Sequence, residues 1–223
     1  MCISRSDARR LIKIGKVFVN GEKAKAFDTK ISEADEIMAD GKKIELAKTV
    51  YIIMNKQAGV VCDDKSSAPY APDTLPDNLK RKDLFCVGRL DKDTTGLLLI
   101  TNDGEYAHSV ISPKKHIEKR YQATLENAVN ENDIEQAEKG IVLKDSTNLL
   151  PSKIIPITPD KKTVDFIVTE GKYHQIKRMA GALDNKILSL HRYKIGELEL
   201  PENLSFGEAK RVEKEQAFLV FKK

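Results

Sequence analysis

The sequence contains no tryptophan and only three cysteines, Cys2, Cys62 and Cys86. An odd number of cysteines without a Cys-x-x-Cys pair predicts neither a disulfide framework nor a metal site, and it fits a reducing compartment. No apolar run approaches the roughly 20 residues that span a bilayer. The polar, basic start of the chain lacks the apolar core of a secretory signal. We therefore expect a cytoplasmic protein with no membrane association.

The formal net charge is only +4 over 223 residues, but the charge is unevenly distributed. Residues 1–25 hold seven Lys and Arg against two Asp and Glu, residues 108–121 four against one, and residues 172–194 six against one. A single basic segment is usually a solvated face. Three such segments on a nearly neutral chain favour a polyanionic partner, and nucleic acid in particular.

The start of the chain predicts a small unit of its own. A serine N-cap, an apolar stripe of helical spacing and Gly15 at its end indicate a helix. The turn Asn20-Gly21 is typical of a hairpin. The expected elements are a helix over residues 4–15 and short strands over residues 16–19, 35–37 and 44–46. We place the boundary near residues 47–49, which gives domains over residues 1–47 and 48–223.

The second domain predicts an α+β fold with a mixed, mostly antiparallel β-sheet. Strand patterns outnumber helix patterns, and the connections are too short for repeated βαβ crossovers. Residues 62–83 contain three prolines and are expected to form a loop. The expected strands cover residues 50–54, 120–125, 153–157, 163–169, 187–190, 192–195 and 218–221, and the expected helices cover residues 105–111, 131–139 and 175–183.

The stretch from Gly88 to Gly104 carries the clearest chemical signal. Its pattern predicts a strand, an exposed loop, a second strand at residues 97–100 and a turn. The loop presents Arg89 and Asp91 between two rigid elements, which is a common position for catalytic groups. An aspartate in such a loop can also cap its own turn. The loop pattern by itself leaves both interpretations open.

Four segments resemble, in sequence and in order, the motifs of the RsuA-type pseudouridine synthases, which isomerise uridine in ribosomal RNA. The segments are Gly88 to Gly104, Lys119-Arg120-Tyr121, Glu170 to Met179 and Leu190 to Gly196. The resemblance implies the catalytic fold of that family and a reaction in which the uracil is detached, rotated and rejoined to the sugar through C5. Because nothing is gained or lost, it implies neither a cofactor nor a metal.

The first unit resembles the α-L RNA-binding module of ribosomal small-subunit proteins and some tRNA synthetases, on residues 4–12 and 15–21. The module of that family begins with a further helix, for which this chain has no residues. We therefore expect a truncated or minimal module, and a unit of about 45 residues is marginally stable even when complete. The side chains expected to bind RNA here are Arg5, Arg9, Arg10 and Lys13.

The resemblance assigns the chemistry to Asp91, Tyr121 and Lys177. Asp91 is the catalytic carboxylate, and it acts on the sugar either as a nucleophile or as a base. Lys177 matches the basic residue that pairs with this aspartate and favours its charged form, although it can instead contact phosphate; Arg178 is its rival for the pairing. Tyr121 matches a tyrosine that stacks on the uracil, although a strand tyrosine can also be a core residue.

The remaining expected substrate contacts surround the same loop. By resemblance, Arg89 enters the RNA and fills the space of the flipped base, a role that suits a planar cation; the alternative is a surface phosphate contact. Ile176 is expected to form an apolar wall of the pocket, and Arg178 to bind substrate. The resemblance gives His174 a structural role.

The leading hypothesis is a monomeric enzyme that isomerises a uridine of small-subunit ribosomal RNA, as free RNA or in a pre-ribosomal particle. The subunit preference rests on residues 93–96, 111–113 and 190–192, which resemble the small-subunit members of the family. One alternative is a synthase for large-subunit RNA. Another is a non-catalytic RNA-binding factor in ribosome assembly, which would be free to lose one of the three catalytic residues.

Overall fold

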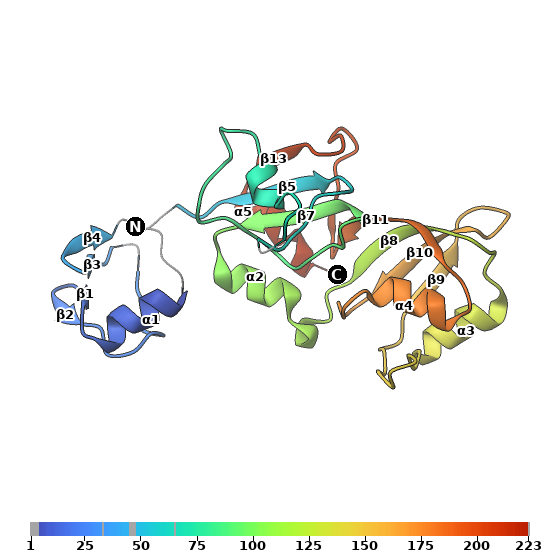
Figure 1. The fold of residues 1–223 in the computed structure, drawn as a ribbon, viewed down its shortest axis with the longest axis horizontal. Coiled ribbons are helices and arrows are strands. Elements are labelled where there is room, and N and C mark those ends of the chain that lie inside the picture. Colours follow the sequence, from blue (N-terminus) through green and yellow to red (C-terminus); the bar gives the residue numbers. More distant parts are fainter. Residues whose placement is uncertain (1–4, 33, 45–47, 65, 223) are drawn as a thin grey trace. The chain divides into compact units, whose positions relative to one another are not determined.

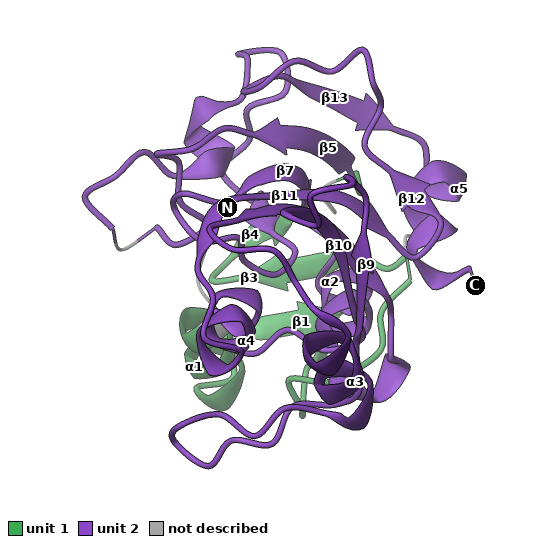
Figure 2. Cartoon of the chain, turned by 90° about the vertical axis from the view of Figure 1, so that its right-hand side faces the viewer, with its two compact units in different colours: residues 1–49 green, residues 50–223 purple. Residues whose placement is uncertain are grey.

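The computed structural model describes the chain except for residues 1–4, 33, 45–47, 65 and 223 (Figure 1). The chain divides into two compact units, residues 1–49 and residues 50–223 (Figure 2). The end of the strand expected at residues 44–46 lies outside the described residues. No helix of the described part is long and apolar enough to cross a membrane.

The first unit packs one helix against a small antiparallel sheet with the strand order β2-β1-β3-β4. Leu11 of the helix is 7% exposed, and Ile37 and Ala39 of the sheet are also buried. Both residues of Asn20-Gly21 have positive φ, as the tight hairpin turn requires. The elements are α1 (Arg5–Lys13), β1 (Val17–Val19), β2 (Glu22–Lys23), β3 (Ile37–Ala39) and β4 (Lys42–Ile44).

The second unit is built on one mixed sheet with the order β13-β5-β7-β11-β8-β10-β9; β6 pairs with β7, and β12 pairs with β11. The pair β7–β11 is parallel and the other pairs are antiparallel, which confirms the expected α+β class. The strands are β5 (Tyr51–Lys56), β6 (Phe85–Cys86), β7 (Thr95–Thr101), β8 (Lys119–Leu125), β9 (Lys153–Pro156), β10 (Thr163–Val168), β11 (Ile187–Ile195), β12 (Leu198–Glu199) and β13 (Ala209–Val212).

Helices α2, α4 and α3 lie along one side of this sheet (Figure 1). The strands alternate between two faces, as a pleated strand must. Tyr51 and Ile53 of β5 belong to the buried cluster that includes α2, whereas Ile52 and Met54 pack with the irregular segment before β7. The helices are α2 (Gly104–Ile111), α3 (Glu131–Lys139), α4 (Gln175–Ala182) and α5 (Lys214–Ala217), with 3-10 turns at Ala71–Thr74, Pro113–Lys115 and Phe218–Phe221.

A glycine makes the parallel pairing at the centre of the sheet possible. Gly96 of β7 pairs with Arg192 of β11, and its φ is +103°. A Cβ atom at this position would lie 2.2 Å from the carbonyl oxygen of Arg192. Only glycine fits this approach, which brings β11 beside the loop that carries Asp91.

Two expectations for the second unit were wrong in detail. The run Phe218–Phe221 is a 3-10 turn, not a strand, and it packs on the aromatic ring of Tyr106. A short apolar run has no periodicity that separates a strand from a helical turn. The strands expected at residues 187–190 and 192–195 form one strand, β11, whose pairing with β8 shifts register beside Arg192.

Candidate active site

Asp91 lies on a short, well-anchored loop directly before β7. Leu90 and Thr94, on either side of it, are 5% and 2% exposed, while the Asp91 side chain is 25% exposed. The amide of Thr94 donates a hydrogen bond to the carbonyl of Asp91 at 3.1 Å and closes a turn. The carboxylate therefore stands on a rigid support at a pocket. The same pocket is lined by Arg89, Tyr121, Ile176 and Lys177.

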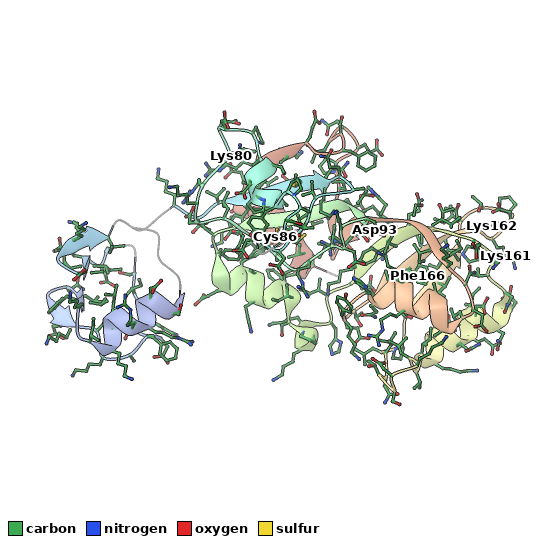
Figure 3. All side chains as sticks on the ribbon, in the orientation of Figure 1. Lys80, Cys86, Asp93, Lys161, Lys162 and Phe166 are labelled. Atoms are coloured by element: carbon green, nitrogen blue, oxygen red, sulfur yellow. The ribbon has the colours of Figure 1, made fainter. Side chains whose placement is uncertain are left out.

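Lys177 reaches this loop from the first turn of α4. Its Nζ lies 3.1 Å from Oδ2 of Asp91 and 2.5 Å from Oδ1 of Asp93; Figure 3 labels Asp93 in this region. Partial burial lowers the pKa of Lys177, but the hydrogen bonds and charges of the two carboxylates outweigh it, so the pKa lies above its usual value. The Lys177 ammonium group beside Asp91 therefore keeps its positive charge.

Arg178, the rival for this pairing, is directed elsewhere. Its Nη2 lies 2.5 Å from Oδ2 of Asp145, and its Nη1 donates to the carbonyl of Tyr173 at 3.5 Å. Consecutive residues of a helix do not share a face, so only one of the two cations can turn toward Asp91. The structure brings Lys177 to that position.

Tyr121, on β8, is held by an arginine that the sequence analysis did not select. Nη1 of Arg192 lies 3.4 Å from the Tyr121 hydroxyl, and the guanidinium carbon lies 5.8 Å from the centre of its ring. Arg192 is 4% exposed, and its Nε donates to the carbonyl of Leu97 at 2.9 Å. Among the described residues, Nη2 of Arg192 is buried without a hydrogen-bond partner. The only sequence signal for Arg192 was its place in the fourth motif.

The other expected pocket residues differ in exposure. The side chain of Arg89 is 67% exposed and lies 3.8 Å from Oδ2 of Asp63, so its guanidinium is open to solvent. Ile176 is 4% exposed and contributes a buried apolar wall. The pocket thus joins an exposed cation, a partly buried carboxylate and an apolar surface.

His174 contacts the second carboxylate oxygen of Asp91. Its Nε2 lies 3.4 Å from Oδ1 of Asp91, on the opposite oxygen from Lys177. His174 has a φ of 48°, in the left-handed region that side-chain-bearing residues rarely adopt. The structure thus adds a direct contact with Asp91 to the structural role expected of His174.

A layer of residues beneath the loop, also absent from the sequence analysis, fixes its backbone. Lys56 is fully buried, and its Nζ donates to the carbonyls of Val60 at 2.8 Å and Lys92 at 3.4 Å. Burial lowers the pKa of Lys56. Sγ of Cys62 accepts a hydrogen bond from the amide of Leu90 at 3.4 Å. These contacts tie the loop that carries Asp91 to the segment that follows β5.

The thiol of Cys62 also forms a hydrogen bond with the thiol of Cys86. A hydrogen bond with Cys86, followed by the Leu90 amide and the positive charges of Arg192 and Lys56, overcomes burial and lowers the pKa of Cys62. The pKa of Cys86 is raised, chiefly by the same hydrogen bond and by burial. Neither cysteine had a motif that would have marked it.

The basic residues expected to bind RNA in the first unit lie on α1. Arg9, Arg10 and Lys13 are exposed. The guanidinium of Arg9 lies 4.4 Å from the centre of the Phe27 ring, and Arg10 lies 4.0 Å from Asp7. The side chain of Arg5 is outside the described part of the structure. In that part, no cluster of three or more His, Cys, Asp or Glu side chains is arranged to hold a metal.

Both units of the chain match families of known proteins. Residues 50–182 match the family model of the RNA pseudouridylate synthases, and residues 1–37 match the S4 domain. The chain belongs to the RNA pseudouridylate synthase family. It is an RNA pseudouridine synthase with an N-terminal S4 domain, as the resemblance to the RsuA-type enzymes implied.

Three similar proteins show how far the likeness extends. Ribosomal small subunit pseudouridine synthase A of Vibrio cholerae is 39% identical over 98% of this chain and 94% of its own. The uncharacterized RNA pseudouridine synthase YtzG of Bacillus subtilis is 34% identical over 97% and 92%. A crystal structure of a pseudouridylate synthase superimposes with a TM-score of 0.73 at 36% identity, over 98% of this chain and 94% of that one. The likeness therefore includes both units.

Proposed function

We propose that this pseudouridine synthase isomerises a specific uridine of the small-subunit ribosomal RNA. The observation that carries the proposal is the contact of Lys177 with Asp91 at 3.1 Å in a pocket that Tyr121 also lines. The name of the Vibrio cholerae relative supports the choice of the small subunit. A synthase for large-subunit RNA would use the same chemical groups. The experiment must therefore distinguish a small-subunit from a large-subunit RNA substrate.

Asp91 acts on the sugar of the target uridine, either as a nucleophile or as a base that removes a sugar proton. In both cases the bond from the sugar to N1 of uracil breaks, and a bond from the same carbon to C5 forms. C5 loses a proton and N1 gains one, so the atoms balance without a cofactor. Lys177 keeps a positive charge at the carboxylate, and pairing with a cation favours the charged form of an acid.

The other pocket residues hold the base. Tyr121 stacks on the uracil, and Arg192 fixes the direction of the Tyr121 hydroxyl. Ile176 provides an apolar wall that excludes water. Arg89, with its exposed side chain, enters the RNA and takes the place of the flipped base. Arg178 binds substrate beside the pocket.

The S4 unit supplies additional RNA affinity through the basic side chains on α1. Positively charged residues that neutralise phosphates release counterions, which adds affinity without sequence preference. The unit accounts for 49 residues, and the chemical groups named here belong to the other unit. We propose that the enzyme works in the cytoplasm as a monomer and acts on RNA within a pre-ribosomal particle.

The test maps pseudouridines in ribosomal RNA from cells with and without this protein. We expect one uridine of the small-subunit RNA to lose its modification, and the purified enzyme to restore it. Initial rates are then compared on free small-subunit RNA, free large-subunit RNA and assembly intermediates of each. A faster rate on large-subunit RNA would overturn the subunit assignment, and equal rates on free RNA and particles would remove the preference for a particle.

A further inference from the structure

An exposed pair of stacked rings lies beside the catalytic pocket. The ring centres of Tyr173 and His174 are 3.8 Å apart, and the ring planes differ by 19°. His174 thus covers one face of the tyrosine. Tyr173 is nevertheless 67% exposed, so its opposite face is open to solvent. An open aromatic face of this kind is the usual surface on which a single-stranded base stacks.

The segment that carries the two rings is held rigidly. Glu170 is 7% exposed and accepts hydrogen bonds from the Leu150 amide at 2.9 Å and from the Gln175 side chain at 3.2 Å. The Lys172 amide donates to the Gln175 side chain at 2.9 Å. The backbone that flanks Tyr173 is therefore fixed before RNA binds, and preorganisation of this kind reduces the entropy cost of binding.

His174 connects the open ring to the reacting carboxylate. Its left-handed backbone, with a φ of 48°, directs one imidazole both to the Tyr173 ring and to Oδ1 of Asp91 at 3.4 Å. A residue in this region costs free energy and persists where the surrounding structure imposes it, often at functional sites. His174 thus contacts the Tyr173 ring as well as the Asp91 carboxylate, which places the platform residue next to a neighbour of Asp91.

We propose that Tyr173 is a stacking platform for an RNA base that flanks the target uridine. The inference rests on the proposed function, because it requires the target uridine at Asp91. A uridine that leaves its stack exposes its neighbours, and single-stranded bases are recognised by stacking on aromatic side chains. Lys172 precedes Tyr173 in the chain and Arg178 donates to the Tyr173 carbonyl at 3.5 Å, so both add positive charge near the platform for the backbone of the same strand. The platform recognises a splayed strand without reading the identity of the base.

The first test measures RNA binding and turnover with the ribosomal RNA that the wild-type enzyme isomerises. Tyr173→Ala should raise Kd and KM by about tenfold, within the range of one base–aromatic stack. It should leave the salt dependence of binding unchanged, because no phosphate contact is lost. Tyr173→Phe keeps the ring and should stay within about twofold of wild type. Phe206→Ala removes a ring that is 61% exposed outside the pocket and serves as the matched control.

The second test uses the absence of tryptophan from the chain. Tyr173→Trp places a single tryptophan on the platform, whose fluorescence is excited selectively over that of the tyrosines, and a stacked base should quench it. RNAs with one abasic position are scanned along the nucleotides that flank the target. We expect quenching to disappear at one flanking position, on either the 5′ or the 3′ side, while the other abasic RNAs quench normally.

The outcomes separate this inference from the proposed function. Pseudouridine formation by the wild-type enzyme is measured in the same reactions. If that enzyme modifies only large-subunit RNA, the subunit proposal fails, and the platform is tested on that RNA instead. The platform is overturned if Tyr173→Ala leaves Kd and KM unchanged on an RNA that the wild type modifies. It is also overturned if no flanking abasic position alters the quenching.

Discussion

Lys177 and Asp91 meet across 3.1 Å, although 86 positions separate them in the sequence. The same ammonium group also contacts Asp93, which is 71% exposed. His174 lies on the other oxygen of Asp91, so one short segment at the start of α4 supplies both neighbours of the carboxylate. These two contacts fix the orientation of the Asp91 side chain. The roles of the Asp91 carboxylate and the Lys177 ammonium group can therefore be tested separately.

Asp91→Asn should abolish isomerisation and leave RNA affinity nearly intact. The amide keeps the shape of the side chain, but it is neither a base nor an effective nucleophile. The measurement is pseudouridine formation on ribosomal RNA, with binding titrated in parallel. Residual activity within about tenfold of wild type, or ~1.4 kcal/mol of barrier, would contradict the catalytic role. Asp93→Asn is the matched control and should retain activity within that limit.

Lys177→Met should lower kcat by more than about tenfold, with a smaller effect on Kd. The reason is that Asp91 loses the cation beside it. Binding is titrated against salt to separate this role from a phosphate contact. If Lys177 contacts phosphate, its loss should weaken binding and reduce the salt slope by about one unit. Arg178→Met removes a neighbouring cation that pairs with Asp145. The kcat, Kd and salt slope of this variant are compared with those of Lys177→Met.

The elements that could be predicted are those whose signals lie close together in sequence. The helix at residues 131–139 has a capping box formed by Asn130 and Asp133, and it ends at Gly140 as expected. The alternating strand at residues 163–168 was also expected. Edge strand β13 has the polar sequence Ala-Lys-Arg-Val, and it forms because it pairs with β5, more than 150 positions earlier. Pairing over that distance leaves no local signal.

The candidate site likewise contains some residues that the sequence could predict and others that it could not. Asp91, Tyr121 and Lys177 could be proposed because a family resemblance marked them, and the fold brings them to one pocket. Lys56 and Arg192 were missed because their importance arises from burial. A lysine in a strand pattern indicates a solvated position, yet Lys56 is fully buried, with backbone carbonyls as its acceptors. Such a contact depends on where separate loops meet, which spacing alone does not reveal.

Tyr121→Phe separates the ring of this tyrosine from its hydroxyl. Stacking survives, so Kd should stay near the wild-type value. Arg192 donates a hydrogen bond to the hydroxyl oxygen, so the O–H bond points away from the arginine and remains available to the substrate. Because Tyr121→Phe removes this O–H group, we expect kcat to fall by about tenfold or more. Arg192→Lys should lower kcat in the wild-type background but add little in the Tyr121→Phe background, because the two residues act together. Additive losses in this double-mutant cycle would contradict the coupling.

Lys119→Met should change the pH dependence of stability. Burial, together with the charge of Arg192, lowers the pKa of Lys119 to about 8, whereas an unfolded lysine titrates near 10.4. Between these values the unfolded chain binds more protons, so wild-type stability rises with pH across that window. At pH 7 the wild type buries a charged ammonium group, which the methionine variant avoids. The free energy of unfolding of Lys119→Met relative to wild type should therefore fall by up to about 3 kcal/mol between pH 7 and pH 10.5.

Denaturant unfolding at several pH values measures the effect of Lys119→Met. The comparison is the difference between variant and wild type at each pH, because this difference removes the titration of all other lysines. Lys144→Met, at an exposed position, is the control for the replacement of a lysine by methionine. A constant difference between Lys119→Met and wild type from pH 7 to pH 10.5 would show that Lys119 does not titrate early.

Deleting residues 1–49 should weaken RNA binding and leave the second unit folded. The three large buried clusters of the second unit draw only on residues after position 49. The pocket also belongs to this unit, so kcat at saturating RNA should be kept while Kd and KM rise. Circular dichroism and denaturant unfolding test the fold, and titration at several salt concentrations tests the binding. Loss of a cooperative unfolding transition would show that the S4 unit is needed for the core.

The binding loss on deletion should come from the basic face of α1. Arg9, Arg10 and Lys13 are exposed there, and each phosphate contact that is lost lowers the salt slope by about 0.7 to 0.9. The triple replacement of these residues by alanine in the full-length chain should therefore reproduce most of the loss in affinity and in salt slope. It should keep the fold of the first unit, because Leu11, through which the helix packs in the core, is unchanged. If the triple variant binds like wild type while the deletion does not, the RNA contacts of this unit lie outside α1.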